Sequence, residues 1–189
     1  MKKLAFFLTI FCGLVSGTAL AQVTNTTGPG PKTATATLNV KLYPIQTILI
    51  GANSTVDLEY QTKEDYSNGV TKTMNDHLIV YSTGGFAVKV KSENENLVRK
   101  EGDSKIAVNT INLQASLGSN TTLTDATFDE NVKLTNSYAS LISSKVGGTD
   151  LKFNVAYNGI GNNDYVNKYN NVENPTVYTT TVTYTIEAQ

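Results

Sequence analysis

The stretch that decides the fold is YTTTVTYTI, residues Tyr178 to Ile186, near the end of the chain. Its odd positions are all threonine, and four of its five even positions are tyrosine, valine or isoleucine. A period of two residues is typical of a half-buried β-strand, because successive side chains point to opposite faces of a sheet. Strands also favour β-branched and aromatic residues. This stretch therefore predicts a long strand whose even-numbered side chains face the core.

The same alternation recurs upstream, most clearly in residues 33–42. There the even positions are apolar and the odd ones polar; the apolar set is Ala34, Ala36, Leu38, Val40 and Leu42. Alternating segments also lie at residues 56–60, 86–91, 106–117 and 151–157, and residues 77–82 form a further candidate strand. Many short strands separated by turn residues indicate a β-sandwich. We therefore predict one all-β domain over residues 33–189, an antiparallel β-sandwich of about eight or nine strands, with the even face of 34–42 buried.

Four connecting segments give more local predictions. Glycine favours tight turns, so Thr83-Gly84-Gly85 predicts a hairpin between two alternating segments. Residues 61–69 are polar and predict a long loop or an edge turn. The alternation changes phase between Val108 and Ile111, which predicts a bulge or a short break. Residues 123–144 fit neither period, and we expect one short strand and one helical turn there.

The composition excludes most classes of catalytic site. The 189 residues include 27 Thr and 20 Asn, which suits strands and turns, but a single histidine (His77) and a single cysteine (Cys12). A nucleophilic triad needs a base, and zinc or copper needs several His or Cys ligands. We therefore expect a non-enzymatic protein without cofactor or metal, and a structural role for His77. Five loop carboxylates are candidates for a calcium site or for an acid–base pair: Glu64, Asp65, Asp125, Asp129 and Glu130.

The N-terminus resembles an export signal. Two lysines precede an apolar run from Leu4 to Val15, and small residues precede Gln22. This pattern predicts a signal peptide over residues 1–21 and export to the periplasm, the cell surface or the medium. The apolar run is too short to span a membrane, and no later stretch is longer. Glycines and prolines in residues 22–32 predict a flexible arm.

Charge bears on the partners of the exported chain. Cleavage after Ala21 would leave 13 basic and 16 acidic residues and no cysteine. A surface with this balance does not attract nucleic acid or anionic membranes, so we expect neither as a partner.

One loop carries candidate binding residues. Residues 158–175 contain seven asparagines, with tyrosines between them. Tyrosine offers rigid contact area and asparagine offers adaptable hydrogen bonds, a combination that suits recognition loops. The candidate binding residues are Asn162, Asn163, Asp164, Tyr165 and Tyr169. A solvent-exposed turn without a specific partner is the alternative interpretation.

The signal peptide, the alternating residues 34–42 and the final strand 178–186 together resemble exported bacterial pilin-like proteins, especially the spore-coat-U and related fimbrial subunits. That resemblance implies an Ig-like sandwich assembled into surface fibres by strand exchange. Residues 33–42 and 178–188 would then provide the edges for self-association, because unpaired edge strands are templates for another chain. We thus expect an exported structural or adhesive protein. The alternative is a monomeric secreted module that recognises a glycan or surface ligand through loop 158–175.

Overall fold

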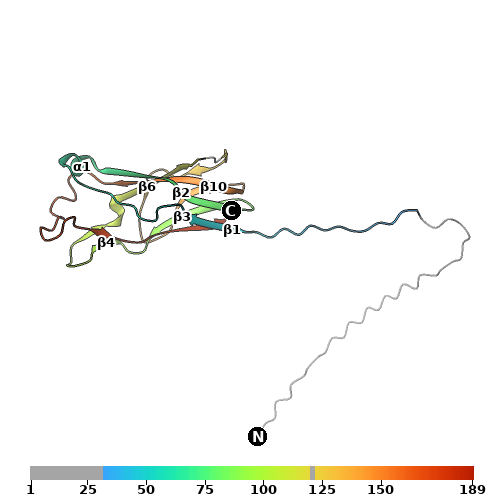
Figure 1. The fold of residues 1–189 in the computed structure, drawn as a ribbon, viewed down its shortest axis with the longest axis horizontal. Coiled ribbons are helices and arrows are strands. Elements are labelled where there is room, and N and C mark those ends of the chain that lie inside the picture. The colour runs from blue at the N-terminus through green and yellow to red at the C-terminus, as the bar shows by residue number, and fades with distance from the viewer. Residues whose placement is uncertain (1–31, 120–121) are drawn as a thin grey trace, which may run out of the picture. The chain divides into compact units, whose positions relative to one another are not determined.

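A computed structural model describes residues 32–119 and 122–189 (Figure 1). Contacts divide the chain into two units, Met1–Lys41 and Leu42–Gln189. The predicted signal peptide, residues 1–21, and most of the predicted Gly/Pro arm, residues 22–31, lie outside the described residues. Among the described residues, no helix is long and apolar enough to cross a membrane.

The second unit is an all-β sandwich, which confirms the predicted fold class (Figure 1). All its strand pairs are antiparallel. The first sheet has the order β1 (Gln46–Ile50), β2 (Val70–Ser82), β10 (Gly148–Gly159), β6 (Ile111–Leu117) and β8 (Val132–Lys133). The second has the order β12 (Val182–Ala188), β3 (Phe86–Ser92), β9 (Ala139–Ser144) and β7 (Thr127–Phe128). A small third sheet has the order β11 (Tyr178–Thr179), β4 (Asn96–Arg99) and β5 (Lys105–Ala107).

The core lies between the two larger sheets and is aromatic at its centre. Phe153 on β10 is fully buried and packs edge-on against Phe86 on β3 and Phe128 on β7, with ring centroids 6.3 and 6.2 Å apart. Aliphatic side chains from both sheets complete it, among them Leu78, Val80, Val88, Val90, Leu113, Leu141, Ile142 and Val155. The alternation in residues 86–91 and 151–157 therefore identified core-facing side chains correctly.

The predicted hairpin at Thr83–Gly85 is wrong. Strand β2 pairs with β1 and β10, whereas β3 pairs with β12 and β9, so the turn carries the chain from one sheet to the other. Both strands are interior strands of their own sheets and find their partners elsewhere in the chain. A glycine turn permits a sharp reversal but does not determine which strands pair across it.

The predicted strand at residues 33–42 is also wrong. This N-terminal segment, as we call it below, forms no strand in the described structure and all of its residues are exposed. Leu38 and Leu42 are 88% and 89% exposed. Pairing in the sandwich begins only at Gln46, after Pro44, which cannot donate a backbone hydrogen bond. The alternation suits a strand, but the segment pairs with no strand among the described residues.

The C-terminal strand is divided rather than continuous. Its first two residues form β11 and pair with β4, and pairing with β3 begins at Val182. Between them, the Thr180 hydroxyl lies 2.9 Å from that of Ser92. Val182, Tyr184 and Ile186 are partly buried and pack against the core, as the alternation predicted. Strand β12 is an edge strand of its sheet.

The remaining local predictions had mixed outcomes. Residues 61–69 contain a helix, α1 (Lys63–Asn68), not only a loop. Thr62 and Asp65 form a reciprocal capping box that starts it. Residues 123–144 form the short strands β7, β8 and β9 and no helical turn. The predicted break after β5 is confirmed as a 3₁₀ turn, η1 (Val108–Thr110).

Candidate functional site

Strand β2 is covered along only part of its outer edge. The β1 pairing runs from Gln46 opposite Ser82 to Ile50 opposite Leu78. The Gly51 N–H then donates to the His77 carbonyl oxygen at 2.8 Å, and the chain leaves the sheet. A Cβ at position 51 would lie 2.3 Å from the Asp76 carbonyl oxygen, so this approach requires glycine. Beyond it, residues 70–76 have no strand partner on this edge within the described structure.

A second unpaired segment runs opposite this edge. Residues 53–59, the facing segment, belong to no strand, and no backbone hydrogen bond joins them to β2 in the described part of the chain. Val56 and Leu58 pack against the core, whereas Thr55, Asp57 and Glu59 are exposed. The facing segment therefore packs on the sandwich through its side chains, and its backbone has no hydrogen-bond partner within residues 32–119 and 122–189.

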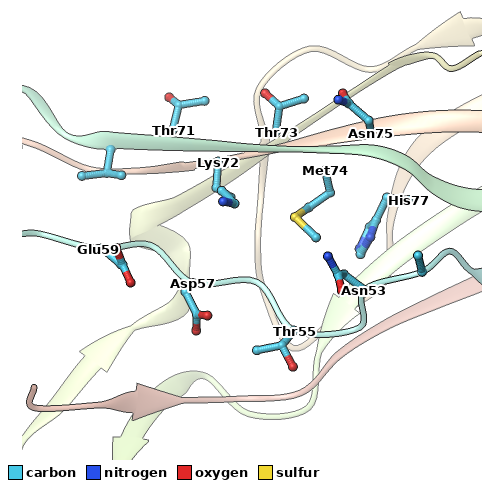
Figure 2. Close-up of a pocket in the computed structure, with 12 residues that line it drawn as sticks. Asn53, Thr55, Asp57, Glu59, Thr71, Lys72, Thr73, Met74, Asn75 and His77 are labelled. Atoms are coloured by element: carbon cyan, nitrogen blue, oxygen red, sulfur yellow. The ribbon is translucent and has the colours of Figure 1, made fainter.

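Between these two segments lies a groove of about 730 Å³, the β2 groove (Figure 2). Figure 2 shows Lys72 and Met74 pointing from β2 into this space, while Thr71, Thr73 and Asn75 point away from it. Met74 is buried, and the rims are polar. Its lining comprises Ala52, Asn53, Thr55, Asp57, Glu59, residues 70–75 and His77.

A bulge in β2 sets the end of the groove. The β2–β10 register shifts between the pairs Leu78–Phe153 and Met74–Val155, and Asp76 has a left-handed φ of 50°. The Asp76 carboxylate accepts hydrogen bonds from the N–H and hydroxyl of Ser119, which lower the pKa of the carboxyl group. Because a bulge bends the strand that carries it, Asp76 diverts β2 at the point where β1 ends.

His77 closes the inner end of the groove through a buried network. Its Nε2 lies 2.9 Å from the Tyr157 hydroxyl, which lies 2.5 Å from the Tyr184 hydroxyl. The three residues come from β2, β10 and β12, so the network joins the two larger sheets. Burial lowers the pKa of His77, raises that of Tyr157 to about 12 and raises that of Tyr184 still further. All three groups are therefore neutral near pH 7.

This network makes stability depend on pH. Burial lowers the pKa of His77 from its ordinary value of 6.5, so between 6.5 and the lower folded-state value the unfolded chain binds more protons than the folded protein. The contribution of His77 is complete above pH 6.5 and is lost as the pH falls towards the folded-state pKa. We expect urea denaturation at a series of pH values to show this decline. In His77→Gln the decline should be shallower, and identical slopes in both proteins would contradict the prediction.

The predicted binding loop is held by its own backbone contacts. Asn162 and Asn163 have left-handed φ values, and their N–H groups donate to the carbonyl oxygens of Ser67 and Tyr66. Tyr169 is exposed and does not line the β2 groove. The loop therefore packs against the α1 end of the sandwich, and its two central asparagines serve as turn residues.

Tyr165 and Asp164 lie in a different setting from the asparagines. The Tyr165 ring packs edge-on against Tyr60, with centroids 4.9 Å apart, and its hydroxyl lies 2.6 Å from that of Thr110. Both residues line a smaller cavity of about 390 Å³, together with Asn96, Lys105, Ile106, Ala107, Thr110 and Lys168. Of the five predicted binding residues, the structure thus brings only these two into one cavity.

Two of the five loop carboxylates, Asp65 and Asp125, have structural partners. Asp65 caps α1, and its pKa is lowered by the backbone N–H groups of Thr62 and Gln61. Asp125 accepts hydrogen bonds from the Ser144 hydroxyl and the Lys145 N–H. Within residues 32–119 and 122–189, no three His, Cys, Asp or Glu side chains are grouped so as to hold a metal ion.

Comparison with known proteins adds no relative. A scan against protein-family models found no match to this chain. A search of curated proteins found no match either. The functional argument below therefore rests on the residues and geometry described above.

Proposed function

We propose that this chain is a non-enzymatic exported structural or adhesive protein, a pilin-like subunit that self-associates into fibres at the bacterial surface. The exposure of the N-terminal segment carries the proposal. Its apolar residues Leu38, Val40 and Leu42 are 88%, 77% and 89% exposed and lie on one face of an alternating pattern. Single exposed apolar residues are common, but a contiguous apolar face marks an interaction site.

Two further observations support self-association. The segment alternates as a strand does but pairs with no strand among the described residues, so its backbone groups are available to another sheet. The sandwich offers edges for such pairing, at residues 70–76 of β2 and at β12. Extended segments add to exposed sheet edges through main-chain hydrogen bonds. Export, which the pattern of residues 1–21 supports, would bring the subunits to the surface.

The test is the oligomeric state of the exported protein. We expect size-exclusion chromatography with light scattering, and electron microscopy, to reveal oligomers or fibres. Replacing Leu38 and Val40 together with aspartate should release monomers, because both charges would enter the apolar contact. A matched variant with aspartate at Thr37 and Asn39 adds the same charge to the opposite face and should still assemble. A parent protein that stays monomeric at high concentration would contradict the proposal.

A second candidate function is a monomeric secreted module that recognises a glycan or surface ligand. The cavity that Asp164 and Tyr165 share with Lys105 and Lys168 favours it, because it combines an aromatic ring with charged and hydrogen-bonding groups. Under this alternative the Leu38 and Val40 double variant would leave both the oligomeric state and ligand binding unchanged, whereas Tyr165→Ala would weaken binding to a glycan array.

A further inference from the structure

We infer that the β2 groove binds a small zwitterion, a free amino acid or a short peptide, whose ammonium and carboxylate groups pair with charged side chains on both walls. Such binding is independent of the proposed function, because it needs neither the N-terminal segment nor a second copy of the chain. At about 730 Å³, the groove lies within the size range of small-ligand sites. The order of charged, apolar and hydrogen-bonding groups along the groove defines the ligand.

Three charged side chains lie on the two walls at one end of the groove, which we call the charged end (Figure 2). Lys72 points into the space from β2, whereas Asp57 and Glu59 belong to the facing segment. All three are exposed, and none of them forms an ion pair within the described residues. Of the three side chains, Glu59 alone accepts a hydrogen bond there, from the Gln61 amide at 2.7 Å. A ligand with one ammonium and one carboxylate group can pair with both walls at once, whereas a singly charged ligand meets a like charge.

The inner end of the groove has an uncharged polar group that lacks a partner. His77 is only 4% exposed, and Figure 2 shows its ring directed into the groove, which Asn53 also lines. Its Nε2 is paired with the Tyr157 hydroxyl, but its Nδ1 makes no hydrogen bond within the described residues. A neutral imidazole carries one N–H, so Nδ1 either donates or accepts, and an amide group matches both forms. A ligand that brings an amide to this end supplies the missing hydrogen bond.

Met74 lies between the two ends and provides an apolar surface. Its side chain is buried and points from β2 into the groove, between Lys72 and His77 in Figure 2. An unbranched thioether adapts to the methylene groups that pack against it. Charged groups, methylene groups and an amide follow each other in the same order along the amino acid glutamine. Glutamine, free or at the C-terminus of a short peptide, is therefore the ligand that the groove matches best.

Both walls are held by contacts that do not involve the charged side chains. Val56 and Leu58 fix the facing segment by packing against the core. The bulge fixes β2 through the hydrogen bonds that Ser119 donates to the Asp76 carboxylate. The groove is therefore formed before a ligand arrives, as in most small-ligand sites. Substitutions at the charged end should change binding and leave the fold intact.

The NMR signal of the histidine ring reports binding directly. His77 is the only histidine in the sequence, so its Cε1–Hε1 resonance needs no further assignment. In the untagged exported protein, we expect added glutamine to shift this resonance in a saturable way. N-acetylglutamine lacks the ammonium group and glutaminamide lacks the carboxylate, so each should bind about tenfold more weakly. Alanyl-glutamine and alanyl-alanyl-glutamine test the peptide form, and the compound with the highest affinity shows whether the ligand is a free amino acid or a peptide.

Variants at the charged end test the same site from the side of the protein. The double variant Asp57→Asn and Glu59→Gln removes the partners of the ammonium group, and Lys72→Gln removes the partner of the carboxylate. Each should weaken glutamine binding by about tenfold, the loss of one charged hydrogen bond. Circular dichroism should show both variants folded as the parent is.

Matched controls remove the same charges from exposed positions outside the groove. They are the double variant Asp129→Asn and Glu130→Gln, and the single variant Lys100→Gln, and they should leave the affinity unchanged. The inference is wrong if neither glutamine nor the two peptides shift the His77 resonance, if the blocked compounds bind equally well, or if the control variants weaken binding as much. The assembly proposed above would stand in each case, because it rests on the N-terminal segment.

Discussion

Replacing Phe153 with alanine is expected to lower the free energy of unfolding by about 3–5 kcal/mol. Phe153 is fully buried and contacts the rings of Phe86 and Phe128 on the opposite sheet, so truncation removes aromatic contacts between the two larger sheets and leaves a cavity. Because the site lies between two hydrogen-bonded sheets, the surroundings have little freedom to collapse into the space. Urea denaturation followed by circular dichroism measures the loss.

Val172→Ala is the matched control, since Val172 is 87% exposed. It should change the free energy of unfolding by no more than about 0.5 kcal/mol. Equal stability of Phe153→Ala and the control would mean that the two sheets do not share the core described here.

Removing the hydroxyl of Tyr157 is the second large perturbation. Tyr157→Phe should cost about 1–3 kcal/mol, because it leaves the buried His77 Nε2 and the Tyr184 hydroxyl without their shared partner. The ring itself is retained, so packing changes little. Chemical denaturation at pH 7.5 measures the loss.

Tyr169→Phe provides the control for this hydroxyl, because Tyr169 is exposed and belongs to no network described above. If Tyr157→Phe lowers the free energy of unfolding no more than Tyr169→Phe does, the network does not stabilise the packing of the two sheets.

Within the sandwich, side-chain alternation predicted burial well and strand pairing poorly. Phe86, Val88, Phe153 and Val155 face the core as their spacing indicated, because a strand with one buried face must alternate. The same alternation at residues 33–42 belongs to an exposed segment, since a pattern of side chains does not say which sheet the backbone joins. The sequence does contain an indication of helix α1, because Thr62 and Asp65 have the spacing of a capping box within a polar stretch.

The candidate site was harder to predict because it depends on distant contacts. The bulge in β2 is stabilised by hydrogen bonds from Ser119 to the Asp76 carboxylate, and these two residues are 43 positions apart in the sequence. Nothing in the sequence indicates that Gly51 approaches the Asp76 carbonyl oxygen closely. The alternation of Val56 and Leu58 predicted an ordinary strand, and only the structure reveals that this segment stays unpaired opposite another unpaired edge.

The passage of the chain between sheets at Thr83–Gly85 has a kinetic consequence. Because β3 pairs with β12 and β2 pairs with β10, strands early in the sequence depend on partners that are synthesised late. Topologies dominated by such distant pairings fold slowly, typically in milliseconds to seconds. The second sheet cannot form its final pair until residues 182–188 are available. Under the proposed export, such a chain would pass through the export channel unfolded and would fold once its last strand has emerged.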